Sequence, residues 1–175
     1  MSLWGDKLHI GCGDKYLQNW CNVDIIGPPH TKADEIFSLT DYPLDENTYE
    51  IIYMSHVLEH VWRSDVPAVL RRLYLALRPR GTLLVSVPDL VKVAAWVQEN
   101  PPRDPNGPIF GDYNKGSAEC DRHKFVYYEA ALKSLFIVAG FESPNLWAVA
   151  EYPQIAALHD WASWDTISLN MRGVK

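Results

Sequence analysis

The sequence of 175 residues lacks the features that mark several classes of protein. Its three cysteines, Cys12, Cys21 and Cys120, form no CxxC pair. An odd number of cysteines without that spacing predicts neither a disulfide framework nor a metal site. No run of about 18 apolar residues is present, so we expect no membrane partner. No signal-peptide pattern precedes Lys7, and we therefore expect a soluble, cytoplasmic protein.

The chain also has few basic residues, with 16 lysines and arginines compared with 22 acidic residues. The formal net charge of -6 leaves no electrostatic footprint for a polyanion, which disfavours a nucleic-acid partner. Hydrophobic residues make up 47% of the chain, as in ordinary globular proteins. We expect a single domain over residues 1–175, with a loop insertion at about 100–124, where four prolines and three glycines occur.

The most informative stretch is KLHIGCGDKYLQNWCNVDI, residues 7–25. A short apolar run, which predicts a buried strand, breaks at Gly11 and Gly13, where the backbone can turn sharply and a ligand can approach closely. A second predicted strand ends near Asp24. A glycine turn after one strand and an acid after the next is typical of a nucleotide site, with the carboxylate on the ribose hydroxyls. The third glycine of a dinucleotide fingerprint is replaced by Tyr16, which disfavours an NAD site.

The remainder of the chain alternates between apolar runs, which predict strands, and segments of helical periodicity. This alternation predicts a doubly wound α/β fold. The further strands are expected at residues 33–39, 50–54, 82–87, 141–149 and 165–171, and the helices at 66–77, 90–99 and 129–139.

Taken together, five segments resemble the Rossmann-like S-adenosylmethionine-dependent methyltransferases, and most of all a compact bacterial type associated with sugars or surface polysaccharides. The resemblance implies an α/β, doubly wound sheet of seven mostly parallel strands, the last antiparallel, with helices on both faces. It places S-adenosylmethionine across the carboxyl ends of the first four strands. The segments are LHIGCG (8–13), NVDI (22–25), YPLDENTYEIIYMSHVLEHV (42–61), LRPRGTLLVSVPDL (77–90) and HKFVYYEAALKSLFIVAGFE (123–142).

The same resemblance implies a set of cofactor-binding residues. Two departures stand out, because His9 replaces an acid common in the first motif and Lys15 replaces its third glycine. A satisfied core histidine is an equally good interpretation of His9. Ser38 aligns with an acid near the adenine amine, and Asp41 is an alternative there. The implied cofactor residues are His9, Gly11, Cys12, Gly13, Asp24, Ser38, Met54, Ser55 and His56.

Three residues are candidates for catalysis. His123, with an ordinary pKa near 6.5, could deprotonate an attacking hydroxyl or amine, although it could also anchor the preceding loop. His56 is either a proton acceptor or a structural histidine near a helix start, and Asp89 follows the fifth strand. Asp112 and Tyr113 are weaker candidates.

Other polar and aromatic residues have a structural interpretation first. Glu59 and His60 belong to the LEH segment, and we expect both to be structural. Aromatic residues are dense toward the C-terminus, where packing is their more frequent role and an acceptor pocket is the alternative. These aromatic residues are Trp147, Tyr152, Trp161 and Trp164.

The sequence therefore predicts an S-adenosylmethionine-dependent methyltransferase acting by in-line displacement on a small-molecule or sugar-type acceptor. An inactive cofactor-binding or scaffold protein of the same fold is the alternative. A nicotinamide-dependent enzyme is a third possibility, which the missing glycine disfavours. The sequence indicates neither the methylated atom nor the oligomeric state.

Overall fold

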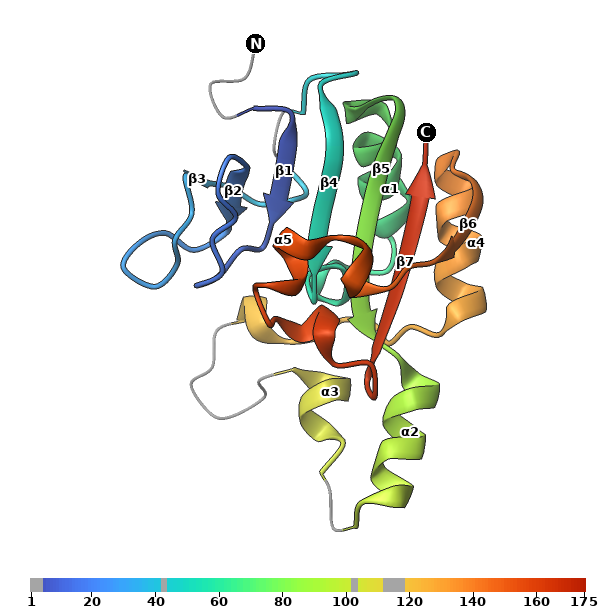
Figure 1. The fold of residues 1–175 in the computed structure, drawn as a ribbon. Coiled ribbons are helices and arrows are strands. Elements are labelled where there is room, and N and C mark those ends of the chain that lie inside the picture. Colours follow the sequence, from blue (N-terminus) through green and yellow to red (C-terminus); the bar gives the residue numbers. More distant parts are fainter. Residues whose placement is uncertain (1–4, 42–43, 102–103, 112–118) are drawn as a thin grey trace.

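The computed structural model describes residues 5–41, 44–101, 104–111 and 119–175 (Figure 1). Its strands form a single sheet in the order β3-β2-β1-β4-β5-β7-β6. The strands are β1 (Lys7–Ile10), β2 (Cys21–Asp24), β3 (Glu35–Ile36), β4 (Tyr49–Ser55), β5 (Leu77–Pro88), β6 (Glu142–Leu146) and β7 (Ser168–Val174).

Helices cover both faces of this sheet, with α1 and α4 on one side and the short α5 on the other (Figure 1). Below the sheet in this view, α2 and α3 extend beyond the ends of the strands. Among the described residues, no helix has the length and apolar character needed to cross a membrane. The helices are α1 (Val66–Ala76), α2 (Leu90–Glu99), α3 (Asn106–Phe110), α4 (Glu129–Ala139) and α5 (Pro153–Ala156), with 3-10 turns at Leu58–His60, Glu119–Asp121, Val149–Glu151 and Trp161–Ser163.

The strand directions confirm the predicted α/β, doubly wound sheet. The five strands from β3 to β5 pair in parallel, whereas β7 lies antiparallel between β5 and β6. Parallel neighbours bring their carboxyl ends to one edge of the sheet, where ligands of open α/β sheets bind. The ends of β1, β2 and β4 therefore meet at the edge that carries the motifs of the sequence.

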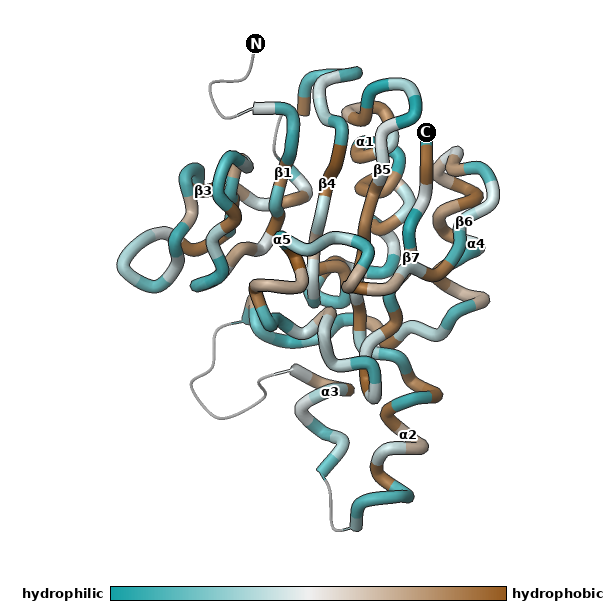
Figure 2. The backbone as a smooth tube through the Cα atoms, viewed as in Figure 1, coloured by the Kyte–Doolittle hydropathy of each residue, from teal (hydrophilic) through white to brown (hydrophobic). Residues whose placement is uncertain are grey.

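Successive side chains of β4 point to opposite faces of the sheet, and each face is covered by a hydrophobic core. Ile52 and Met54 join the core under α1 and α4, while Tyr53 joins a second core on the opposite face, and all three are fully buried. That second core contains Trp147 and Ile155 from the C-terminal segment. Figure 2 shows hydrophobic residues along the central strands, as expected for a sheet that is buried on both faces.

Several predicted elements differ in length from those observed. The strand expected at 33–39 forms only the two-residue β3, and the strand expected at 141–149 is shorter. The region 100–124, predicted as a loop, contains α3 and a 3-10 turn in its described part. The helix 129–139 is observed as predicted and ends at Gly140, whose φ of 109° suits glycine.

Truncation of a buried residue of α4 tests this packing. Leu132 is fully buried, so Leu132→Ala should lower the free energy of unfolding by about 2–5 kcal/mol. Val138 lies on the same helix with 73% of its surface exposed, so Val138→Ala should change stability by less than about 0.5 kcal/mol. Urea unfolding followed by circular dichroism measures both values, and equal losses would contradict the packing described here.

Candidate functional site

Two cavities lie at the carboxyl edge of the sheet. One has a volume of about 1060 Å³ and the other about 400 Å³. Gly11 after β1, His56 after β4, and the side chains of His60 and Asp121 line both cavities. The two spaces therefore adjoin, and together they could hold an elongated ligand.

The glycine turn after β1 forms the boundary between the two cavities. Gly11 has a φ of 68°, and its amide donates to the carbonyl of Val23 at 2.8 Å. A Cβ at Gly11 would collide with Cγ2 of Val57. Gly13 has a φ of 52° and donates its amide to a carboxylate oxygen of Asp24 at 2.8 Å. The turn thus requires glycine for its conformation at both positions and for space at Gly11.

Three carboxylates line the smaller cavity, those of Asp24, Glu119 and Asp121, and Asp24 is the one beside the glycine turn. Asp24 ends β2, and its second oxygen accepts the amide of Ile26 at 3.1 Å. Phe37 and Leu39 line the same cavity, together with Ser38, whose hydroxyl lies 2.7 Å from that of Thr40. This arrangement suits a flat, largely apolar ring attached to a diol that binds the carboxylate.

His9 and Cys12 line the larger cavity but are held by the protein itself. The His9 ring stacks on Tyr53, and its Nδ1 lies 3.1 Å from the side-chain oxygen of Asn22. Burial lowers the pKa of His9 to about 4, so the ring is neutral near pH 7. Burial, with a further contribution from Asp24, raises the pKa of Cys12 to about 12, so its thiol stays protonated. Neither residue is prepared for proton transfer.

The end of β4 directs only some of the predicted residues to the site. Met54 is fully buried in the core and does not line either cavity, whereas Ser55 and His56 line the larger one. His56 has a φ of 54°, in the left-handed region that few residues other than glycine adopt, although asparagine, aspartate and histidine occur there more often than other residues. Such strain occurs at functional sites, where the surrounding structure holds it in place.

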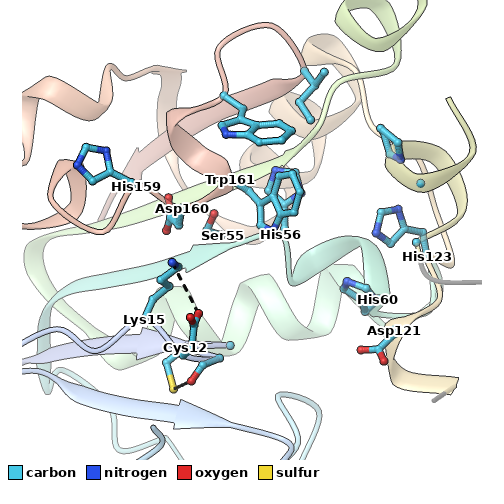
Figure 3. Close-up of a pocket in the computed structure, with 18 of the residues that line it drawn as sticks. Cys12, Lys15, Ser55, His56, His60, Asp121, His123, His159, Asp160 and Trp161 are labelled. Carbon is cyan, nitrogen blue, oxygen red and sulfur yellow. Dashed lines mark hydrogen bonds and ion pairs between the residues drawn. The ribbon is translucent and has the colours of Figure 1, made fainter. Parts of the chain in front are cut away.

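A cluster of imidazoles surrounds a buried carboxylate beside His56. Nδ1 of His56 lies 3.4 Å from Oε1 of Glu59, and Nε2 of His123 lies 3.9 Å from the same oxygen. The rings of His60 and His123 lie edge to face with their centroids 4.7 Å apart. Figure 3 labels both side chains at the cavity. Burial raises the pKa of Glu59 to about 8. Burial also lowers the pKa values of His56 to about 3 and of His123 to about 4.

Asp89 is not brought to either cavity. Its carboxylate accepts the backbone N–H of Val91 at 2.9 Å and caps the start of α2. Asp112 and Tyr113 lie outside the described residues. Of the three catalytic candidates, the structure therefore places His56 and His123 together and Asp89 apart.

The C-terminal aromatic residues divide between the core and the cavity wall. Trp147 is buried and packs on Tyr53, as the packing interpretation predicts. Trp161 and Trp164 are 49% and 50% exposed and line the larger cavity, where Trp161 lies 5.6 Å from the His56 ring (Figure 3). For these two tryptophans the alternative interpretation, a pocket wall, describes the structure better.

Glu59 and His60 are the site residues whose position the sequence analysis missed. The 3-10 turn Leu58–His60 follows β4. His60 lines both cavities, and Glu59 is buried beside the His56 and His123 rings. A single acid in the mostly apolar segment 57–62, flanked by His56 and His60, is the sequence signal that could have identified them.

The comparisons with known proteins agree with this geometry. Residues 7–143 match a family model described as a methyltransferase domain. No curated protein matches the chain. Many solved structures match it, at identities so low that the similarity shows a shared fold.

Three of these structures illustrate the similarity. An S-adenosylmethionine-dependent methyltransferase from Mesorhizobium loti is 16% identical, with a TM-score of 0.60 over 100% of this chain and 94% of the other. One from Archaeoglobus fulgidus is 13% identical, with a TM-score of 0.61 over 97% and 85%. A phosphoethanolamine N-methyltransferase 2 from Haemonchus contortus, in complex with S-adenosyl-L-methionine, is 9% identical, with a TM-score of 0.55 over 100% and 49%.

Alanine at the two glycines of the turn tests its geometry. Gly13→Ala meets no atom within 4 Å and should cost only the strain of a positive φ, about 1–2 kcal/mol. Gly11→Ala carries the same strain and also collides with Val57, so it should destabilise the protein by more. Urea unfolding of both variants measures the difference, and a Gly13→Ala loss equal to or larger than that of Gly11→Ala would refute this description.

Proposed function

The chain belongs to the methyltransferase-domain family of Rossmann-like, S-adenosylmethionine-dependent methyltransferases, and from this premise we propose that it methylates a small-molecule or sugar-type acceptor. One observation supports the proposal most directly. A cavity containing a carboxylate and a cavity walled by tryptophans share Gly11 and His56 as lining residues. A donor that spans this boundary, with its ring in the first cavity, could therefore present its methyl group to an acceptor in the second.

The residues of the two cavities fit the cofactor. A carboxylate offers about four lone-pair positions, and Asp24 uses two of them on backbone amides, so the ribose hydroxyls can bind the others. Ser38 lies in the same cavity, where the adenine would bind among apolar side chains. The open space beside Gly13 would accept the amino-acid tail, with Cys12 and Ser55 nearby on the cavity wall. When bound, S-adenosylmethionine supplies a methyl group on a positively charged sulfur.

The protein's main tasks are to hold the two reactants in line and to exclude water. The leaving group needs no general acid, because its sulfur carries a positive charge before the transfer. We propose His123 as the residue that acts on the proton of the acceptor, because its side chain lines the same cavity as the two tryptophans. Both nitrogens of His56 face protein atoms, Ser168 and Glu59, so His56 is better placed as a positioning residue.

The wall of the larger cavity supports a ring-shaped acceptor. The rings of Trp161 and Trp164 pack edge to face with their centroids 4.4 Å apart, and about half of the surface of each residue is exposed. Indole faces stack well on the apolar faces of sugars and on other rings. Because both side chains line the cavity that contains His123, an acceptor stacked there would lie close to the transfer point.

Transfer from a labelled donor tests the proposed reaction. The protein should transfer the labelled methyl group to at least one member of a panel of sugar nucleotides and small hydroxyl or amine compounds. A single-turnover format, with protein in excess, detects slow transfer to a poor substrate. Tight donor binding without transfer to any compound in the panel would contradict the proposal and favour the inactive scaffold.

Removal of the Asp24 carboxylate tests the cofactor site. Asp24→Ala should weaken S-adenosylmethionine binding by tens- to hundreds-fold, since hydrogen bonds to a charged group contribute about 1.5–3 kcal/mol each. Titration calorimetry measures the affinity, and circular dichroism checks that the variant still folds. Asp45→Ala, at an exposed acid outside both cavities, is the matched control and should bind normally. Unchanged affinity in Asp24→Ala would show that the ribose binds elsewhere.

A further inference from the structure

Glu59 lacks the partners that a buried carboxylate normally has. Its side chain is 0% exposed, and neither carboxylate oxygen has a hydrogen-bond partner among the described residues. In the same residues, its ion-pair neighbours are the imidazoles of His56 and His123, and no lysine or arginine pairs with it. A buried, unpaired carboxylate is costly, so a proton or a cation must balance it.

The hydrogen bonds of His56 show that a lone pair faces this carboxylate. The hydroxyl of Ser168 donates its single hydrogen to the carbonyl of Trp161 at 2.7 Å. It must therefore accept a hydrogen bond from Nε2 of His56, which lies 2.9 Å away. A neutral His56 with its proton on Nε2 turns the lone pair of Nδ1 toward Glu59 Oε1 at 3.4 Å.

A second lone pair comes from His60. Its Nδ1 lies 3.2 Å from the carbonyl of Arg122 and must donate, which leaves the lone pair on Nε2. Orientation of one ring nitrogen by a backbone carbonyl is typical of histidines that bind metals. A ligand atom from each of Glu59, His60 and His123 lies within 4.8 Å of the others. One proton on Glu59 could satisfy only one of these converging groups.

We propose that Glu59, His60 and His123 bind a divalent transition-metal ion such as Zn²⁺ at the junction of the two cavities. Two imidazoles and one carboxylate are a donor set that suits such ions, whereas Mg²⁺ prefers a shell of oxygens. At metal–ligand distances of about 2.0–2.2 Å, ligand atoms in a tetrahedral site lie roughly 3.3–3.6 Å apart. Small side-chain rotations toward the ion would bring the three groups to that spacing.

The fourth position of this ion would face the acceptor. His60 lines both cavities and His123 lines the larger one, so a three-residue ligand set leaves an open side toward the bound molecules. An open position is the mark of a catalytic rather than a structural metal site. This role rests on the proposed function. With the ion bound, His123 would act on the acceptor through the ion rather than directly.

An acceptor hydroxyl bound to the ion would lose its proton more readily, because a metal lowers the pKa of a bound oxygen. The proton leaves to solvent, and the oxygen–methyl bond forms as the sulfur–methyl bond breaks. The sulfonium becomes a neutral thioether, so atoms and charge balance without another reactant. The inference therefore favours a hydroxyl acceptor over an amine.

Metal titration of the untagged protein tests the site independently of activity. After treatment with a chelator and its removal, the protein should bind one equivalent of Zn²⁺ or Co²⁺ by calorimetry, and Co²⁺ should give a visible ligand-field spectrum. Mg²⁺ should bind at least about 100-fold more weakly than Zn²⁺. Glu59→Gln preserves the size of the side chain and should lower Zn²⁺ affinity at least about 100-fold. His30→Ala, at an exposed histidine remote from the cluster, is the matched control and should bind Zn²⁺ normally.

The outcomes separate this inference from the proposed function. Absence of Zn²⁺ binding by the wild-type protein, or equal Zn²⁺ affinity in a folded Glu59→Gln variant, would overturn the metal site. His60→Ala provides a second ligand variant if Glu59→Gln fails to fold. S-adenosylmethionine binding is measured on the same metal-free protein. A protein that binds Zn²⁺ but not S-adenosylmethionine would overturn the proposed function and support the metal site. A protein that binds S-adenosylmethionine but not Zn²⁺ would overturn the metal site and leave the proposed function standing.

Discussion

The hydrogen bond from the Gly13 amide to the Asp24 carboxylate, 2.8 Å long, ties the turn after β1 to the end of β2. The Gly11 amide adds a bond of 2.8 Å to the carbonyl of Val23. Together they keep two walls of the site at a fixed separation, and the positive φ values of both glycines make this possible. The shared boundary of the two cavities lies at this turn, so the relative position of the two cavities depends on it.

Much of the sheet could be predicted from the sequence, because its strands are short apolar runs bounded by turn residues. The same local logic identified Asp24, since an acid at the end of the second strand lies at the edge where the glycine turn also emerges. The helix 129–139 was predictable to its last residue because Gly140 ends it. The two-residue β3 was overestimated, because only Glu35 and Ile36 pair with β2 and none of residues 33–39 is buried.

The rest of the site depends on contacts between distant parts of the chain. His56 and Ser168 are 112 residues apart, and only the antiparallel β7 brings them together. Trp161 and Trp164 lie in and just after a short 3-10 turn, which is too short for a hydrophobic pattern to indicate which side chains are exposed. Glu59 was interpreted as structural because its motif does not indicate whether a cation lies nearby. Only the folded structure shows that its carboxylate oxygens have no hydrogen-bond partner among the described residues.

The C-terminal segment contributes Trp161 and Trp164 to the wall of the larger cavity. The central claim is that one donor molecule spans both cavities across Gly11. A crystal structure with S-adenosylhomocysteine tests it most directly. We predict that the ribose hydroxyls bind Asp24 and that the sulfur lies beside His56. A ribose bound away from Asp24, or a sulfur that does not face the larger cavity, would contradict the claim.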